Sequence, residues 1–385
     1  MPTLGVNIAI LDDRNRLLLT RREDFDMWCL PGGGVEVGES LAQAAQREAH
    51  EETGLDVALI RLVGVYSRPG VSRFNGQIFV FAARPIAGMP SPQSCETTEA
   101  RFFDPGELPT DLVQLAPLRI QHALHGVGGS AVWAIHQDWR FPAEIGEADL
   151  YRLRDVSALS RLDFYQQHIG NTIPPGIVRE LPGYGMVSLP DILNTGSAEL
   201  DGFSPAVAAI AAILRDGKLL LTQREDFEVW SLPGGGVGED ESLTDAARRE
   251  VEEETGLKVR LTRLVGVYSR LNWYGRGIHL VVFAASPVGG SLKPQPNEVL
   301  KIDEFGVRDL PADLGLGHRE MALDALSGVG GSCAWTQRVA WPFPPEMTRR
   351  EIYALRDVSG LSRPDFYRKH FTPVQPGEEI DEIGR

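Results

Sequence analysis

Three glutamates within five positions of one predicted helix, Glu48, Glu51 and Glu52, carry the clearest chemistry in the sequence. Periodic small apolar residues predict this helix over 40–53, and Gly54 stands where a C′ glycine ends a helix. Side chains three and four positions apart share a helix face, so the three carboxylates converge. Their repulsion raises their proton affinity unless a cation lies among them. Oxygen ligands of this kind select Mg²⁺ or Mn²⁺ rather than zinc.

The loop before this helix has features that suit a metal site. Residues 30–34 read Leu-Pro-Gly-Gly-Gly, and glycines permit close approach of the backbone to a ligand. A glycine carbonyl can therefore supply a further oxygen ligand. Arg47 directly precedes the first glutamate of the group and can hold a carboxylate by a bidentate hydrogen bond.

The whole arrangement occurs twice in the chain. Gly33 corresponds to Gly235, and the offset of 235 − 33 = 202 persists without a gap from residues 4–170 to residues 206–372. A period this long is typical of a duplicated domain and not of a solenoid. The second copy repeats the spacing with Gly235, Glu241, Arg249, Glu250, Glu253, Glu254 and Gly256.

A solvated acidic helix face would explain an isolated Glu-x-x-Glu-Glu. It does not explain the longer pattern, because seven fixed residues at about 6% usage each occur by chance in about 10⁻⁹ of windows. The pattern is also present in both copies. We therefore reject the solvated face as the explanation.

The spacing resembles the signature of the Nudix hydrolases, GX5EX7REUXEEXGU, where U is a bulky aliphatic residue. The first copy departs from it only in having Ala49 at the first U position. Outside the fixed spacing, the second copy has Gly238 where the first has Glu36. The resemblance implies an α/β fold: two tandem Nudix-type α/β/α sandwiches around a mixed sheet, each with a C-terminal extension.

The resemblance also implies roles for individual residues. The metal ligands would be the later glutamates and the glycine carbonyl before the motif glycine, namely Glu51, Glu52, Glu253, Glu254, Gly32 and Gly234. Glu48 and Glu250 would ligate or act as general base, and Arg47 and Arg249 would orient the glutamates. The remaining motif residues would be structural, namely Gly33, Glu39, Gly54, Gly235, Glu241 and Gly256.

A later loop often supplies one more acid in this family. Glu96 and Glu298 correspond at the 202 offset and are the candidates. Glu99 is the poorer one, because Lys301 occupies its position in the second copy.

Arg22 and Arg224 follow a predicted strand close to the glycine loop. Two roles stay open for them. They could bind a substrate phosphate, or form a surface salt bridge such as that of Arg22 with Glu23 or Asp24.

Composition limits the partners and the compartment. The formal net charge is −15, which disfavours a stable complex with nucleic acid or an anionic membrane surface. The three cysteines have neither CxxC spacing nor a disulfide pattern, so we expect reduced thiols and a cytoplasmic protein. The sequence contains no run of 18 apolar residues, so we expect no membrane span.

The expected domain organisation has four parts. They are a first Nudix domain with its extension at 1–170, a linker rich in proline and glycine at 171–203, a second such domain at 204–373, and an acidic, loose tail at 374–385. The extensions at 130–170 and 332–372 favour packing or dimer contact over a substrate lid. An internal pseudo-dimer and a homodimer both stay open.

The resemblance implies a metal-dependent hydrolase of a diphosphate bond in a nucleoside diphosphate derivative, such as ADP-ribose, a nucleotide sugar or a nucleoside triphosphate. Pro69 lies 15 residues after Gly54, a position associated with ADP-ribose enzymes, whereas the second copy has Leu271. Two alternatives remain: a nucleotide-binding sensor, or one catalytic copy beside a scaffold copy.

Overall fold

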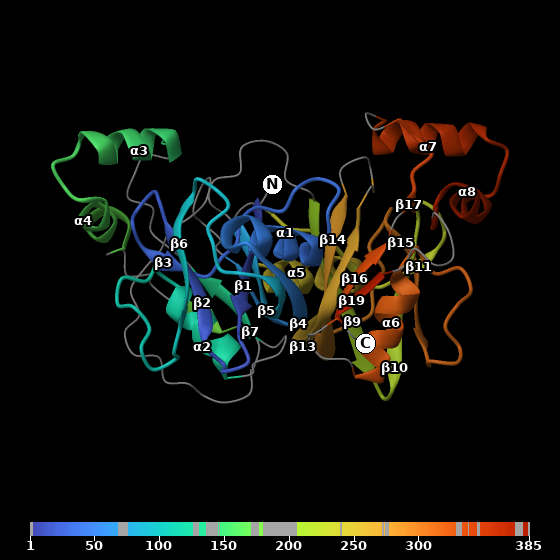
Figure 1. The fold of residues 1–385 in the computed structure, drawn as a ribbon. Coiled ribbons are helices and arrows are strands. Elements are labelled where there is room, and N and C mark those ends of the chain that lie inside the picture. The colour runs from blue at the N-terminus through green and yellow to red at the C-terminus, as the bar shows by residue number, and fades with distance from the viewer. Residues whose placement is uncertain are drawn as a thin grey trace. The chain divides into compact units, whose positions relative to one another are not determined.

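The computed structural model describes residues 3–67, 76–125, 131–135, 145, 147–170, 177–179, 206–238, 241–271, 273, 277–328, 333–337, 339–344, 347–373 and 380–383. The chain forms two compact units (Figure 1). The first comprises Met1–Glu36, Leu41–Ser204 and Glu239–Ser242, and the second comprises Val37–Ser40, Pro205–Gly238 and Leu243–Arg385.

The first unit is built on two sheets. The five-stranded sheet has the order β1 (Thr3–Ile10), β5 (Gly76–Gly88), β4 (Leu55–Ser67), β7 (Ala131–Ile135) and β8 (Ile177–Arg179). It is mixed, because β1 pairs with β5 and β4 with β7 in parallel, while the other two pairings are antiparallel. The three-stranded sheet has the order β3 (Trp28–Cys29), β2 (Leu17–Arg22) and β6 (Thr97–Phe103).

Helices cover both faces of the larger sheet. Helix α1 (Leu41–Thr53) contacts β1 and β4 through its buried alanines, and α2 (Ala116–Leu124) contacts β4 and β5. Figure 1 shows these two helices on opposite sides of the sheet. The extension follows as α3 (Glu147–Val156), α4 (Arg161–Tyr165) and a π-helical turn (Gln166–Gly170). The predicted mixed sheet with flanking helices is confirmed.

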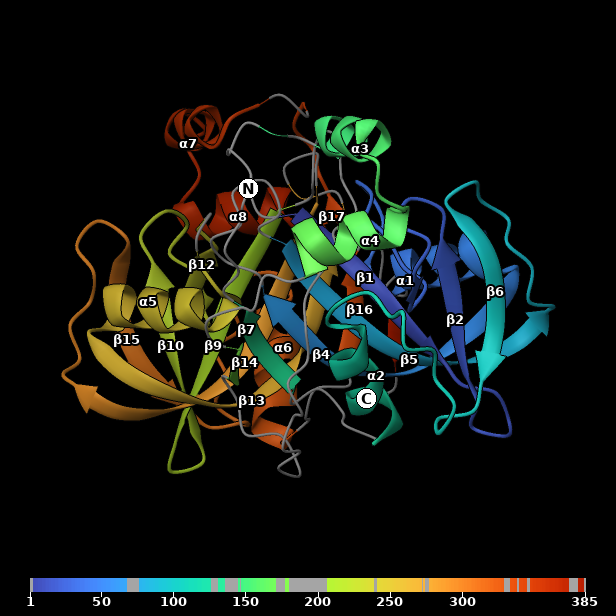
Figure 2. The same cartoon turned by 90° about the vertical axis from the view of Figure 1, so that its left-hand side faces the viewer.

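The second unit repeats this order of strands and helices, but its main strands form one nine-stranded sheet instead of two separate sheets. Its main path has the order β11 (Trp230–Ser231), β10 (Lys218–Arg224), β9 (Ala206–Arg215), β14 (Ile278–Gly290), β13 (Leu257–Arg270), β16 (Cys333–Gln337) and β19 (Ile380–Ile383). Strand β12 (Gly234–Gly236) pairs with β9, β15 (Val299–Phe305) with β10, and β17 (Val339–Ala340) with β18 (Thr372–Pro373). The helices are α5 (Leu243–Thr255), α6 (His318–Ser327), α7 (Arg349–Val358) and α8 (Arg363–His370), seen from a second direction in Figure 2.

The repeat extends beyond the boundaries expected from the sequence. Strand β8 lies inside the expected linker and pairs with β7, with Trp133 opposite Arg179. Strand β19 lies inside the expected loose tail and pairs with β16, with Trp335 opposite Asp381. Both pairs are related by the same offset of 202, since 335 − 133 and 381 − 179 agree. Residues 380–383 therefore close a sheet edge and are not loose, while the rest of 374–385 lies outside the described residues.

Each extension packs onto its own domain. Phe164 and Tyr165 of the first extension share a buried core with Phe25 and Trp28. In the second unit Phe366 and Tyr367 of α8 share a core with Phe227. None of the helices in the described part of the chain is long and apolar enough to cross a membrane.

Candidate active site

Helix α1 presents two of its glutamates to one arginine. Nη1 of Arg47 donates to Oε1 of Glu48 at 2.7 Å and to Oε2 of Glu51 at 3.1 Å, and its Nη2 donates to the carbonyl of Gly34 at 2.8 Å. The arginine thus bridges two carboxylates and the glycine loop, rather than holding a single carboxylate by two bonds. The second copy repeats the three contacts at 2.8, 3.1 and 2.9 Å through Arg249, Glu250, Glu253 and Gly236.

The motif glycine makes room for the first carboxylate. A Cβ built on Gly33 would lie 2.6–2.7 Å from the carboxyl atoms of Glu48, far inside van der Waals contact. A Cβ on Gly235 would lie 2.5–2.7 Å from those of Glu250. The glycine loop and the helix are therefore in direct contact at this point, and the side chain of Glu48 is only 12% exposed.

Gly33→Ala should therefore displace the Glu48 carboxylate and reduce the turnover of the first site by roughly a hundredfold, the cost of a misplacement of about 1 Å. The matched control is Gly106→Ala, because a Cβ there meets nothing within 4 Å. Steady-state rates of the full chain with the second site silenced by Glu250→Gln measure the effect. Equal rates for the two alanine variants would contradict the assigned contact.

The third glutamate has a separate environment. Glu52 is 9% exposed, and its Oε2 accepts from the backbone N–H of Gly32 at 2.9 Å and from Oγ1 of Thr20 at 3.5 Å. Burial, with the nearby charges of Glu48 and Glu96, raises the pKa of Glu52 to about 8, although the Gly32 hydrogen bond and Arg22 oppose the shift.

Glu254 has the corresponding position in the second copy. Burial raises its pKa to about 7, against the lowering effects of Arg224, the Gly234 N–H and the hydroxyl of Thr222. The carboxylate of Glu254 accepts from this hydroxyl at 3.2 Å. Each site therefore holds a carboxyl group, buried in Glu52 and half-buried in Glu254, that gains a proton more readily than an exposed one.

Among its three consecutive glycines, the loop leaves one carbonyl for a ligand. The carbonyls of Pro31, Gly33 and Gly34 accept bonds from Ile8, Val6 and Arg47, respectively. Among the hydrogen bonds of the described residues, none is accepted by the carbonyl of Gly32. This is the carbonyl that the sequence nominated as a metal ligand.

The loop acid nominated from the second copy lies near the carboxylates. The charge of Glu96 raises the pKa of Glu52, and that of Glu298 contributes to the raised pKa of Glu250, after burial. Glu99 instead lies in β6 and pairs with Arg101 at 3.6 Å. Glu96 and Glu298 thus act electrostatically on carboxylates of the motif helix, whereas the ion pair of Glu99 is with Arg101.

The other motif residues hold the ends of the helix. Glu39 is half-buried just before α1, where a negative charge is favourable at a helix N-terminus. Gly54 follows the helix with φ of 70°, a conformation that glycine adopts without strain. Glu241 and Gly256 have the same positions around α5.

Arg22 is part of a salt bridge, one of the two roles left open by the sequence. Its Nε and Nη2 donate to the two carboxylate oxygens of Asp24 at 2.9 and 2.5 Å. Glu23 does not share this bond, since its carboxylate accepts from Arg161. Arg224 is likewise paired with Asp226. Because Arg22 and Arg224 also lower the pKa of Glu52 and Glu254, both guanidinium groups lie close to the carboxylate helix.

The metal-binding prediction needs one refinement. Among the described side chains, no group of three or more His, Cys, Asp or Glu residues is close enough to hold a metal ion as arranged. Arg47 bridges Glu48 and Glu51, while Glu52 turns to the Gly32 N–H. The donor chemistry fits a hard divalent ion, but the carboxylates are not yet gathered around one point.

Sequence reasoning missed a polar cluster beside the first glycine loop. Asn7 accepts from Nη1 of Arg119 at 2.8 Å, and Arg119 lies 5.5 Å from the ring centroid of Tyr66. The Tyr66 hydroxyl is 2.6 Å from Nδ1 of His122. Nδ2 of Asn7 would lie 2.6 Å from a Cβ built on Gly32, so the cluster adjoins the loop.

The second copy differs at three of these positions, with Ala209, Met321 and Asp324. It has instead a half-buried His318, whose Nδ1 accepts from the N–H of Leu232 at 3.2 Å. Arg270 is buried, and burial lowers its pKa to about 10. The sequence signal that could have revealed this cluster is the set of positions at which the two copies differ at the 202 offset. Pro69, the residue associated with ADP-ribose, lies outside the described residues.

Comparison with known proteins identifies both copies. A family model described as the NUDIX domain matches residues 1–123 and 204–325. A protein of Bacillus subtilis (strain 168), named "Putative 8-oxo-dGTP diphosphatase", is 37% identical over 113 residues, which cover 29% of this chain and 74% of that protein. An ADP-ribose pyrophosphatase of Methanocaldococcus jannaschii is 34% identical over 131 residues, covering 33% of this chain and 76% of that protein.

A solved structure of an ADP-ribose pyrophosphatase from Streptococcus suis has 31% identity and a TM-score of 0.29, and the match covers 32% of this chain and 92% of that one. The family generally uses a divalent metal ion. Because the family model matches most of the chain in two separate segments, the protein belongs to the Nudix family and is a tandem Nudix pyrophosphohydrolase acting on diphosphate bonds.

Proposed function

We propose that each half of the chain is an active site that hydrolyses the diphosphate bond of a nucleoside diphosphate derivative with Mg²⁺ or Mn²⁺. The supporting observation is that both copies keep the same arrangement of arginine, two glutamates and glycine carbonyl. Its three hydrogen bonds measure 2.7, 3.1 and 2.8 Å in the first copy and 2.8, 3.1 and 2.9 Å in the second. A copy that served only as a scaffold would not need to keep this geometry.

The residues of the first site divide into three roles. Glu51, Glu52, Glu96 and the Gly32 carbonyl would hold the metal, which supplies charge neutralisation and activates water. Glu48 would ligate as well or take the proton of the attacking water, and Arg47 would orient it. Because the side chain of Glu51 is 52% exposed, it has the freedom to turn and complete the ligand set.

The second site would use the corresponding residues. Its ligands are Glu253, Glu254, Glu298 and the Gly234 carbonyl, with Glu250 and Arg249 in the other two roles. Arg22 and Arg224 would each offer the remaining edge of a guanidinium group to a substrate phosphate. This edge is available because only Nε and Nη2 of each arginine bond the neighbouring aspartate.

We propose further that the two sites prefer different nucleotides. The first site is flanked by Asn7 and Arg119, whereas the second has Ala209 and Met321 at these positions. An amide and a guanidinium group can hydrogen-bond a base or a second phosphate, which alanine and methionine cannot. If one half hydrolyses the substrates more slowly than the other, the second candidate function for that half is a sensor that binds nucleotide without turnover.

The free thiols of Cys29 and Cys95 support a reducing, cytoplasmic compartment.

A substrate panel tests the proposal. The full chain with Mg²⁺ should release a nucleoside monophosphate from at least one of ADP-ribose, a nucleotide sugar, a dinucleotide and an oxidised nucleoside triphosphate. Chelation of the metal should abolish the release. Glu250→Gln and Glu48→Gln, each leaving one site intact, should rank the panel differently. No release from any compound, or release that persists without metal, would contradict the proposed function.

A further inference from the structure

The extensions outside the matched family segments hold the arginine beside each carboxylate helix. We infer that α3–α4 and α7–α8 are positioning clamps that fix Arg22 and Arg224 for binding of the substrate diphosphate, by gripping the loop that carries them. The inference rests on the proposed function of these arginines. In the first copy the gripped loop is 22–25, and the clamp comes from residues more than 120 positions later in the chain.

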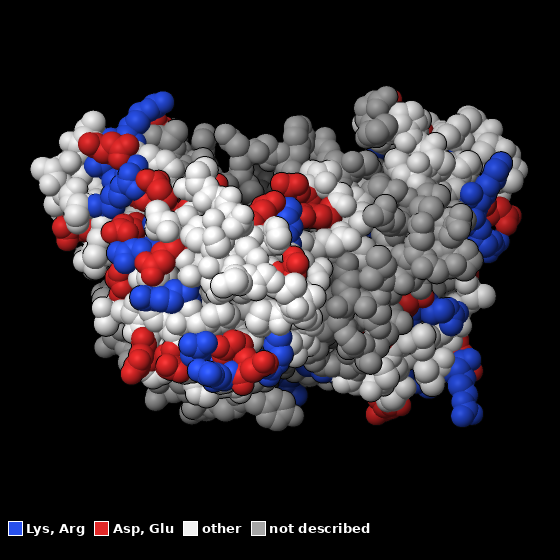
Figure 3. All heavy atoms as spheres, in the orientation of Figure 1, with Lys and Arg blue, Asp and Glu red and all other residues white. Residues whose placement is uncertain are grey.

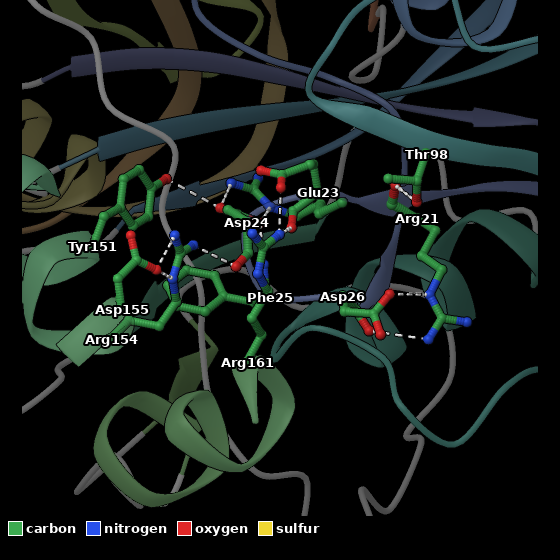
Figure 4. A network of polar contacts seen from close by, with 11 residues as sticks. Arg21, Glu23, Asp24, Phe25, Asp26, Thr98, Tyr151, Arg154, Asp155 and Arg161 are labelled. Carbon is green, nitrogen blue, oxygen red and sulfur yellow. Dashed lines mark hydrogen bonds and ion pairs between the residues drawn. The ribbon is translucent and has the colours of Figure 1, made fainter. Parts of the chain in front are cut away.

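The clamp bonds Asp24, the partner of Arg22 (Figure 4). The Tyr151 hydroxyl of α3 donates to Oδ2 of Asp24 at 3.1 Å, and Nη1 of Arg154 donates to the Asp24 carbonyl at 2.5 Å. Burial alone would raise the pKa of Asp24, but the bonds from Arg22, Phe25 and Tyr151 lower it below its ordinary value. Asp24 therefore stays charged, and both ends of this residue are held by α3.

Packing and a second ion pair hold the rest of the loop. The ring of Phe25 lies 5.9 Å from that of Tyr151 and 5.2 Å from that of Tyr165, between centroids. Arg161, at the start of α4, donates to both the carbonyl and the carboxylate of Glu23. Three consecutive residues after Arg22 are thus each held by the extension.

The second copy reproduces every one of these links. Tyr353 donates to Asp226 at 2.9 Å, Arg356 donates to the Asp226 carbonyl, and Arg363 donates to the carbonyl and carboxylate of Glu225 at 2.5 Å. Phe227 packs against Tyr353 and Tyr367 at 5.7 and 5.3 Å. The second copy has other residues at the positions of Asn7, Arg119 and His122. The two copies therefore share the clamp, but they do not share this polar cluster.

These links restrict the motion of Arg22. Two of its guanidinium nitrogens bond a carboxylate that is itself anchored, while 23% of the side chain stays exposed. An arginine held in this way loses little side-chain entropy when it meets a phosphate. Weakening the clamp should therefore impair substrate binding more than the chemical step. A merely structural extension would instead change the melting temperature and leave the KM of the folded protein unaltered.

The test uses the full chain carrying Glu250→Gln, so that only the first site turns over. Tyr151→Phe removes one hydroxyl and keeps the packed ring, and Asp24→Asn removes the charge that holds Arg22. The matched control is Arg152→Ala on the same helix, whose side chain is 77% exposed and pairs with Asp149. KM and kcat are measured with the best compound of the substrate panel. Calorimetry with Mg²⁺ and inorganic pyrophosphate gives an affinity that does not depend on turnover.

We expect Tyr151→Phe to raise KM roughly three- to tenfold, the loss of about one hydrogen bond, with kcat changed less than about twofold. Asp24→Asn should have a larger effect of the same kind, and Arg152→Ala none. The corresponding substitutions of the second copy, Tyr353→Phe and Asp226→Asn, are made in the Glu48→Gln chain. They should raise the KM of the second site in the same way. The clamp would be overturned if the Glu250→Gln parent chain turns over and neither Tyr151→Phe nor Asp24→Asn changes its KM or its affinity for pyrophosphate. A parent that neither turns over nor binds pyrophosphate would overturn the proposed function itself.

Discussion

Glu48→Gln combined with Glu250→Gln is expected to reduce turnover of every substrate by roughly 10²–10⁴-fold, the usual contribution of a general base. Both carboxylates lie against the motif glycine and accept from the preceding arginine, so glutamine fits the same space with little displacement. The change therefore removes the charge and the basic oxygen and leaves the packing. Rates are measured on the substrate panel with Mg²⁺, together with melting curves that show that the double variant is folded.

The single variants separate the two halves. If both copies are active, Glu48→Gln and Glu250→Gln should each remove one component of the activity, and the two residual rates should add to that of the unsubstituted chain. Glu99→Gln is the matched control, because this glutamate is 44% exposed on β6, pairs with Arg101 and has no role in the proposed site. An unaffected double variant would exclude the assigned chemistry. Loss of all activity by only one single variant would show that the other copy is silent.

The metal-free protein is expected to lose stability as the pH rises from about 5 to about 8. The pKa of Glu52 is about 8 in the folded state against an ordinary value of 4.5, so the folded state binds more protons across this window. Stability falls with pH wherever the folded state holds the extra protons, and the loss is complete above the folded pKa. For Glu254 the corresponding window ends at about 7. Saturating Mg²⁺ should restore stability at pH 8, because it compensates the buried negative charge.

Melting temperatures of the chelated protein across this pH range, with and without Mg²⁺, measure the effect. Glu52→Gln and Glu254→Gln remove the titrating groups and should each flatten part of the pH dependence, the first up to a higher pH than the second. Glu107→Gln, an exposed position in a loop, should leave the profile unchanged. Two results would contradict the prediction: a melting temperature of the metal-free protein that rises with pH over this range, or one that falls equally steeply in the double glutamine variant. Either would show that Glu52 and Glu254 do not dominate the pH dependence of stability.

Much of the site could be predicted because its information is local. Helical periodicity places Glu48, Glu51 and Glu52 on adjoining positions of one helix, and the C′ glycine ends that helix at Gly54. The internal repeat favours Glu96 over Glu99 as the loop acid, since only the former is matched in the second copy. These inferences need only residues that are close in sequence, or a comparison of the two copies.

Other features depended on segments that are distant in sequence. The two roles of Arg22 were equal on sequence grounds, and the choice of Asp24 over Glu23 follows from where α3 and α4 dock. The edge strands β8 and β19 lie in segments rich in proline, glycine or acidic residues, whose local composition predicts loops. They are strands because β7 and β16 offer unpaired backbone groups to them.

By itself, the sequence determined the duplicated unit, the helix that carries the acids and the family to which both copies belong, because each is encoded in spacing along one short stretch or in its repetition. Only the tertiary structure decided that Glu52 is buried while Glu51 is exposed, that Asn7 meets Arg119, and that each extension grips the loop beside its site. Such contacts join residues 20 to 130 positions apart, and their existence depends on how the sheets and helices pack rather than on any local preference.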